Sequence, residues 1–158
     1  MRTWLITELI LLLIVANAAP VIVSLLLGQH GNRPLDGNRL LADGHPLLGP
    51  SKTIRGVIAA VLLTAVAAPL FDLTWLQGAS FGLLAMLGDI GSSFTKRRLG
   101  LASGRSVPLL DQLPETLLPL SVLPPALKMT PLEMFAAVAV FIVVDLLLSR
   151  LLRTLRVP

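Results

Sequence analysis

The chain has 158 residues, of which 54% are hydrophobic and only 14% are charged, and its mean hydropathy is +0.83. Soluble domains carry about 25% charged residues, so this composition excludes an ordinary water-soluble globule and predicts a polytopic membrane protein. The absence of cysteine excludes disulfides, thiolate metal sites and a cysteine nucleophile. A net charge of +4 would favour nucleic acid as the partner of a soluble protein, but we expect no nucleic acid here because the basic residues flank apolar segments.

Five apolar segments predict an all-α fold, with residues 1–158 forming a single transmembrane helical domain. A helix of about 20 apolar residues crosses a hydrocarbon core of ~30 Å. We expect the spans, in chain order, at residues 4–27, 57–71, 76–87, 107–127 and 131–152. Spans two and three form a hairpin whose turn holds Asp72 and Trp75, because indole rings prefer the membrane interface.

A secretory signal peptide is the alternative for the first span. Arg2 precedes its apolar run, and Ala16-Asn17-Ala18 resembles a cleavage site. The apolar run continues over residues 21–27, beyond a normal cleavage position, so we expect the helix to be retained.

Positive charge is concentrated in the two long polar loops, residues 29–56 and 88–106, and at the C-terminal end. These segments hold eleven of the 13 Lys and Arg residues, and only Arg2 and Lys128 lie elsewhere. Loops rich in Lys and Arg stay in the cytoplasm. We therefore expect a multi-pass protein of the plasma membrane, with its N-terminus outside and both loops and the C-terminus in the cytoplasm.

The first loop ends in a segment suited to phosphate, residues 49–56 (GPSKTIRG). Hydroxyl groups and cations directly before a helix give a phosphate hydrogen-bond donors and positive charge. In this segment those groups belong to Ser51, Lys52, Thr53 and Arg55. A Walker A loop is excluded because Lys does not directly follow the second glycine. The alternative is that the basic loops only hold anionic lipid head groups, at ~1 kcal/mol for each Lys or Arg.

A second motif, residues 88–98 (GDIGSSFTKRR), begins at the end of the third span. Residues three and four apart are neighbours on a helix, so helical geometry would place Asp89, Ser93 and Lys96 or Arg97 on one face. An acid, a hydroxyl and a cation would then face the same volume.

The fourth span carries Asp111 and Glu115 one helical turn apart. Two such carboxylates suit Mg2+, which takes one or two protein carboxylates together with phosphate oxygens and water. Pro114 has no N–H and would free the carbonyl of Leu110, which is tolerated at membrane depth where it lines a polar cavity. The five prolines of this segment predict a bent or broken helix.

Three other polar residues are expected to have structural roles only. We expect Asp145, in the fifth span, to pair with a basic residue such as Arg150 or Lys96 and to orient helices. His30 and His45 have no partner at metal-ligand spacing and are expected to be structural.

Together these residues resemble the CDP-archaeol synthase family, a branch of the membrane CTP:lipid-phosphate cytidylyltransferases. The phosphatidate members of that wider group carry similar patterns, S-P-K-K-[ST]-x-E-G and G-D-[LI]-x-x-S-x-x-K-R. Here the resemblance rests on residues 16–20 (ANAAP), 49–56 (GPSKTIRG) and 88–100 (GDIGSSFTKRRLG), and on Asp111-Gln112.

The resemblance implies transfer of CMP from CTP to a lipid phosphate, with Mg2+ as cofactor and pyrophosphate as the second product, in phospholipid biosynthesis. It implies catalytic roles for Asp89, Asp111 and Lys96. The substrate-binding residues would be Ser51, Lys52, Thr53, Arg55, Ser93, Arg97 and Gln112. The metal ligands would be Asp89, Asp111 and Glu115.

The chain departs from the family pattern at a few positions. Archaeal members have Asp-Gly where this chain has Pro50-Ser51, and an acid where it has Pro114, with Glu115 one residue further. Ala102-Ser103 replace a Lys-Asp pair of the phosphatidate members, which weakens the case for phosphatidate but leaves both it and an archaetidic-acid-like lipid open as the acceptor.

Two other classes of function are open to this sequence. A small ion-coupled transporter should show internal symmetry and polar residues near mid-bilayer, whereas the charges here gather toward one side of the membrane. A non-catalytic protein that binds lipid phosphates would carry the same basic loops. The sequence does not indicate an oligomeric state.

Overall fold

Helices build the part of the chain that the computed structural model describes, residues 2–122 and 129–154. Within these residues no β-strand forms beyond two isolated bridges, so the all-α prediction is confirmed. The helices are α1 (Thr3–Leu27), α2 (Ile54–Ala67), the 3-10 helix η1 (Ala68–Phe71), α3 (Trp75–Arg98), α4 (Gln112–Val122) and α6 (Pro131–Thr154).

Three segments of the described residues are long and apolar enough to cross a membrane. They are Thr3–Leu27 (α1), Ile54–Phe71 (α2 with η1) and Pro131–Arg150 (within α6). They coincide with the first, second and fifth predicted spans. Their hydropathy, 2.1 to 2.7 on average, identifies the chain as a membrane protein.

The third predicted span is longer than expected. The helix α3 continues to Arg98, so the prediction of a loop over residues 88–106 is wrong for its first eleven residues. Thr74 and Gln77 form a reciprocal capping box that starts α3. Gly78 and Gly82 let the helix pack directly on α2, where a Cβ atom would lie within 2.4 Å of Thr64 atoms. This packing on α2 positions the first half of α3.

The fourth predicted span, residues 107–127, is wrong in its first part. Residues 108–111 form turns, and α4 begins only at Gln112. Pro114 therefore stands in the first helical turn, where an N–H group has no intrahelical partner to lose. The predicted freeing of the Leu110 carbonyl by Pro114 does not arise, because no helix precedes it. Residues 123–127 lie outside the described part of the chain.

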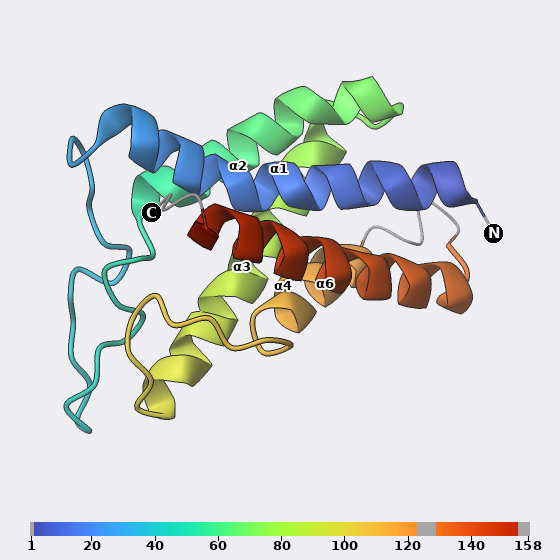
Figure 1. Ribbon diagram of the computed structural model, residues 1–158. Helices are drawn as coiled ribbons and strands as arrows, with labels where there is room; N and C mark the ends of the chain where they lie inside the picture. The colour runs from blue at the N-terminus through green and yellow to red at the C-terminus, as the bar shows by residue number, and fades with distance from the viewer. Residues whose placement is uncertain (1, 123–128, 155–158) are drawn as a thin grey trace.

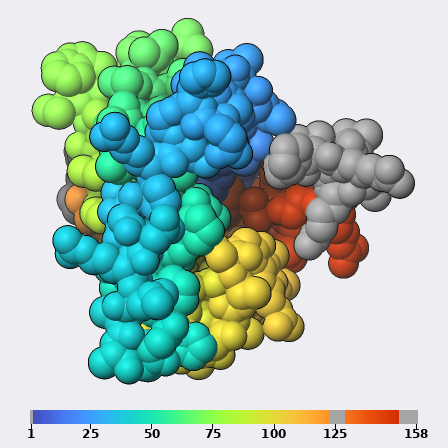
Figure 2. All heavy atoms as spheres, turned by 90° about the vertical axis from the view of Figure 1, so that its left-hand side faces the viewer, coloured from blue at the N-terminus to red at the C-terminus, as the bar shows by residue number. Residues whose placement is uncertain are grey.

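The helices bring both polar loops to one end of the bundle, opposite the N-terminus (Figure 1). In that view α1 and α6 run alongside each other, and α3 and α4 lie beside them. The apolar core contains the fully buried side chains of Leu9, Leu12 and Leu13 from α1, Phe81 from α3 and Phe141 from α6. Figure 2 faces the loop end, where the loop after α1 lies against the segment around residue 100.

The helices α3 and α4 meet at Gly88. A Cβ atom on this glycine would lie 2.3 Å from the carbonyl oxygen of Pro114 and 2.5 Å from the backbone nitrogen of Glu115. No side chain fits into that space. The contact fixes the start of α4, and with it Gln112 and Glu115, against the middle of α3.

Candidate active site

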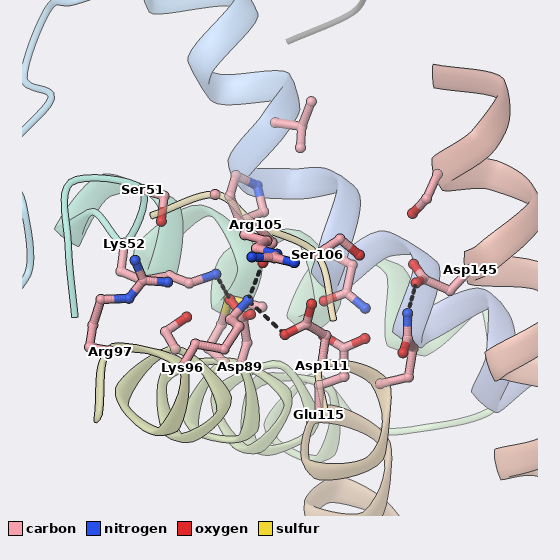
Figure 3. A pocket seen from close by; sticks show the side chains of 18 residues that line it. Ser51, Lys52, Asp89, Lys96, Arg97, Arg105, Ser106, Asp111, Glu115 and Asp145 are labelled. Carbon is pink, nitrogen blue, oxygen red and sulfur yellow. Dashed lines mark hydrogen bonds and ion pairs between the residues drawn. The ribbon is translucent and has the colours of Figure 1, made fainter. Parts of the chain in front are cut away.

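A polar cavity of about 300 Å³ lies among α1, α3, α4, α6 and the two loops (Figure 3). Its lining contains as many cations as carboxylates. The cations are Lys52, Lys96, Arg97 and Arg105, and the carboxylates are those of Asp89, Asp111, Glu115 and Asp145. The volume falls at the lower end of the range of small-molecule sites.

Two ion pairs order the centre of the cavity. Lys52 Nζ lies 2.5 Å from Asp89 Oδ2, and Lys96 Nζ lies 2.7 Å from Asp111 Oδ1. Lys96 also donates a hydrogen bond to the carbonyl oxygen of Arg105, at 3.0 Å. The prediction that Asp89 and Lys96 face one volume is confirmed, because helical geometry does persist through α3. Each pair joins one of the sequence motifs to a distant one.

Arg97 is only 3% exposed, and its side chain holds the second loop. Its Nη2 donates to the carbonyl oxygen of Ala102 at 2.9 Å, while its Nε is buried without a hydrogen-bond partner. Ser93, one turn earlier, is 2% exposed and lines the same cavity. Ser51 lies 3.2 Å from Ser103 between their hydroxyl oxygens, which joins the two loops at the mouth.

Gln112 and Asp145 form the inner wall. Gln112 Nε2 donates to Asp145 Oδ2 at 2.8 Å, and Gln112 Oε1 accepts from the backbone N–H of Leu109 at 2.7 Å. The expectation that Asp145 pairs with Arg150 or Lys96 is wrong, since Lys96 is taken by Asp111 and the described partner of Asp145 is Gln112. Asp145 therefore belongs to the cavity.

Two of the predicted substrate-binding residues make hydrogen bonds at helix ends. The Thr53 hydroxyl accepts a hydrogen bond from the N–H of Gly56 and caps the N-terminus of α2. Arg55 donates to the carbonyl oxygens of His30 and Gly28, at 2.5 and 2.7 Å, just beyond the end of α1. Neither residue lines the charged cavity. The other predicted substrate-binding residues do line it: Ser51, Lys52, Ser93, Arg97 and Gln112.

The predicted metal ligands Asp89, Asp111 and Glu115 share the cavity but do not form a closed metal centre. In the described residues, no three His, Cys, Asp or Glu side chains are close enough to hold an ion by themselves. Glu115 is 6% exposed, and Asp89, Asp145 and Asp111 all act on it electrostatically. Mg2+ often takes only one or two ligands from the protein and completes its coordination shell with phosphate oxygens and water. Several carboxylates around one cavity suit this kind of Mg2+ binding.

Asp36 organises the loop that carries the first motif. Its carboxylate accepts hydrogen bonds from the backbone N–H groups of Asn38, Leu48 and Gly49, at 3.0, 2.8 and 2.9 Å. Burial by itself raises the pKa of Asp36, but these backbone N–H groups outweigh it, so the pKa lies below its ordinary value of 3.8. Asp36 thereby holds Gly49 in place directly before Ser51 and Lys52.

Replacing Asp36 by Ala should lower the thermal midpoint of the purified protein by roughly 5 °C at pH 7, because each buried N–H left without an acceptor costs ~1–3 kcal/mol. The difference from the wild type should shrink in acid. A carboxyl with a depressed folded-state pKa stabilises above its unfolded-state pKa and loses that contribution as the pH falls through the folded value. Asp43→Ala is the control, since Asp43 is exposed and pairs with Arg98 at the surface. An equal shift in both variants would contradict the role of Asp36.

Besides Asp145, four polar residues of the cavity had no role in the site predicted from the sequence: Asn17, Arg105, Ser106 and Ser149. Asn17 lies inside an apolar span, and its Nδ2 is buried without a hydrogen-bond partner. A polar amide within a membrane helix is the signal that could have selected it. Ser106 and Ser149 carry no comparable signal, because serine is common in loops and at helix ends.

The fold and the site thus define a helical membrane protein with a charged cavity suited to phosphates at one end of its bundle. The family model of CarS-like CDP-archaeol synthases matches residues 70–155, more than half of the chain. The chain belongs to this family.

Several proteins of known name or structure are similar to this chain. A CDP-archaeol synthase from Hyperthermus butylicus is 43% identical over 104 residues, which cover 62% of this chain and 59% of that protein. One from Methanopyrus kandleri is 48% identical over 89 residues, covering 52% and 51%. The chain therefore spans between about half and three-fifths of the length of these relatives. A solved intramembrane enzyme for archaeal membrane lipid biosynthesis superposes with a TM-score of 0.76, at 37% identity and 90% coverage of both chains.

Proposed function

We propose that this chain is a cytidylyltransferase that transfers CMP from CTP to a membrane lipid phosphate and so forms a CDP-lipid and pyrophosphate. The observation that supports it best is the cavity in which Lys52–Asp89 and Lys96–Asp111 alternate cations with carboxylates. Cations can bind the phosphates of both substrates, while carboxylates can bind Mg2+. The names of the relatives, CDP-archaeol synthase, agree with this chemistry.

The reaction needs no general base. A phosphomonoester has a second pKa of ~6, so the lipid phosphate is largely a dianion at pH 7 and is already a nucleophile. One of its oxygens attacks the α-phosphorus of CTP, the bond between that phosphorus and the α,β-bridging oxygen breaks, and pyrophosphate leaves with the electron pair. Nucleotidyl transfer of this kind depends mainly on positioning and on neutralising charge.

The residues of the cavity carry out this positioning. Lys52 and Lys96 exchange their carboxylate partners for phosphate oxygens when CTP binds, and Arg97 presents its unpaired Nε to the triphosphate. Asp89 and Asp111, once released from the lysines, would hold Mg2+ together with Glu115. The bound ion would supply further neutralisation of the triphosphate. Gln112 and Asp145 keep the inner wall in place by their mutual hydrogen bond.

We further propose that the chain has five membrane spans in the plasma membrane, with the N-terminus outside and the cavity open to the cytoplasm. The basic loops and the cavity lie at the same end of the bundle, which agrees with the positive-inside rule. CTP would then reach the cavity from the cytoplasm, and the lipid phosphate from the inner leaflet.

An archaetidic-acid-like lipid is the preferred acceptor, and phosphatidate is the second candidate. Ala102 and Ser103 stand where phosphatidate members carry a Lys-Asp pair, and Ser103 contacts Ser51, which lines the cavity. The transporter hypothesis is less favoured because all four of the cavity's carboxylates line a single site. A non-catalytic lipid-phosphate binder is separated from the enzyme only by an assay.

The test is Mg2+-dependent release of pyrophosphate from CTP by purified protein, with unsaturated archaetidic acid and phosphatidate supplied in parallel. Product with the isoprenoid lipid alone, or in clear excess, supports the proposal in full. Product with phosphatidate alone corrects the acceptor. Binding of CTP without product from either lipid would indicate another lipid phosphate as the acceptor. No product and no binding of CTP by the folded protein would contradict the proposed reaction in favour of the non-catalytic alternative.

Replacing Lys96 by Ala should raise the KM for CTP by roughly 10-fold to 100-fold, since a charge-assisted contact to phosphate contributes ~1.5–3 kcal/mol. The KM for the lipid should change less. Arg98→Ala is the matched control, because Arg98 lies two residues further on α3 and pairs with Asp43 outside the cavity. An unchanged CTP dependence in the Lys96 variant would remove this residue from the nucleotide site.

A further inference from the structure

A second, apolar cavity of about 340 Å³ lies between α1 and α6. We call it the α1–α6 groove. Ile14, Ala18, Ile22 and Leu25 form its α1 side, and Phe141 and Leu148 form its α6 side. The proposed chemistry has not used it.

The groove adjoins the charged cavity. Asn17, Val21, Asp145 and Ser149 line both of them. The two cavities together therefore form a path with the cations of α3 at one end and hydrocarbon side chains at the other, and they meet at these shared residues. Their junction contains the buried Nδ2 of Asn17, which donates to no acceptor.

The groove also faces the surroundings of the two helices that form it. Ile22 is 45% exposed and Leu25 is 53% exposed, and both helices are long and apolar enough to cross a membrane. A lipid chain could therefore move laterally from the bilayer into the groove. Purely apolar occupants would leave Asn17 and Asp145 facing hydrocarbon at the inner end, which is unfavourable for polar groups.

We propose that the α1–α6 groove holds one hydrocarbon chain of the lipid phosphate, and that Asn17 donates a hydrogen bond to an oxygen of its head group. The occupant is an amphiphile with an anionic phosphate head and at least one long chain, because only such a molecule matches both ends of the path. This inference rests on the proposed function for the identity of the head group. It adds where the acceptor lipid lies and which residues select it.

Filling the groove should weaken long-chain substrates selectively. Ala18→Phe places a ring in the groove, whereas Ala139→Phe makes the same change on an exposed position of α6 that does not line it. We expect Ala18→Phe to raise the KM for a long-chain lipid phosphate at least 10-fold. The KM for a six-carbon-chain analogue and for CTP should change less than twofold, and Ala139→Phe should change none of the three.

A binding measurement separates this inference from the activity. Both probes are built in a Trp4→Phe/Trp75→Phe background, which removes the two native indoles. Ile22→Trp then places a single indole beside the groove. Leu26→Trp places it instead at a position of α1 where the native leucine is 77% exposed. The probe is a lipid phosphate with brominated chains, compared with a phosphatidylcholine brominated in the same way. The lipid phosphate should quench the indole at position 22 several-fold more strongly than the phosphatidylcholine does, and should show no such preference at position 26.

The outcomes distinguish the two proposals. Preferential quenching at position 22 without any CDP-lipid product would overturn the proposed function but support lipid binding in the α1–α6 groove. Product formation with equal quenching at both positions would overturn lipid binding in the α1–α6 groove but support the proposed function. Equal effects of Ala18→Phe and Ala139→Phe on the KM for the long-chain lipid, or an equal loss of kcat on long-chain and short-chain substrates, would also overturn lipid binding in the groove. If Ala18→Phe does not fold, Ala18→Leu and the quenching experiment decide.

Discussion

Asp89→Asn should abolish measurable CDP-lipid formation, with a fall in turnover on the order of 10²–10³-fold or more, while the protein remains folded in detergent. The loss follows from the position of Asp89, whose carboxylate lies 2.5 Å from Lys52 Nζ inside the charged cavity. Removing one group that organises charge at a reacting phosphate costs about this much in other enzymes. Turnover is measured as pyrophosphate release at saturating CTP, lipid phosphate and Mg2+.

Metal-free CTP binding provides the second readout for this variant. Asn cannot neutralise Lys52 as a carboxylate does, so Lys52 becomes more available to phosphate. CTP affinity without Mg2+ should therefore be unchanged or higher, even though turnover is lost. Asp43→Asn is the matched control, since it removes a carboxylate paired with Arg98 outside the cavity. Near-normal Mg2+-dependent turnover in Asp89→Asn would remove this residue from the active site.

The parts of the site that the sequence predicted are those held by local geometry. Asp89, Ser93, Lys96 and Arg97 follow helical spacing, and the structure confirms that all four line one cavity. The charge pattern likewise predicted that both basic loops belong to one end of the molecule, as Figure 1 shows. A period of 3.6 residues and a count of charges need no knowledge of distant contacts.

The contacts of Thr53, Arg55 and Asp145 were not predicted from residue type. Thr53 and Arg55 have the composition of phosphate ligands, but the ends of α2 and α1 use them as caps. Asp145 accepts a hydrogen bond from Gln112, 33 positions away in the sequence, rather than pairing with a cation. A hydroxyl or guanidinium satisfies a helix end as readily as a phosphate, so residue type alone cannot choose between the two.

The helix boundaries failed for a related reason. Polarity indicated that the third span ends at residue 87, yet α3 continues to Arg98 because its polar second half lines a cavity within the protein. In a membrane protein, hydropathy reports contact with lipid, whereas helix length also depends on contact with other helices. Polar residues that face an internal cavity are therefore easily assigned to loops.

Gly88→Ala should lower both stability and activity, because the α3–α4 contact has no space for a Cβ atom. The added carbon would lie 2.3 Å from the Pro114 carbonyl oxygen and 2.5 Å from the Glu115 nitrogen, so backbone must move. Overpacking of this kind costs ~1–3 kcal/mol. We expect a thermal midpoint lower by roughly 5 °C. Turnover should fall at least 10-fold, since α4 carries Gln112 and Glu115 into the cavity.

Gly91→Ala, one turn further along the same helix, is the control that isolates the contact. A Cβ atom at Gly91 meets nothing within 4 Å, and alanine is a better helix former than glycine by up to ~1 kcal/mol. This variant should keep wild-type turnover and a midpoint that is equal or slightly higher. If helix propensity or a change of residue type controlled the result, both variants would respond in the same direction. Opposite shifts would show that the close approach of α3 and α4 at Gly88 holds the active site together.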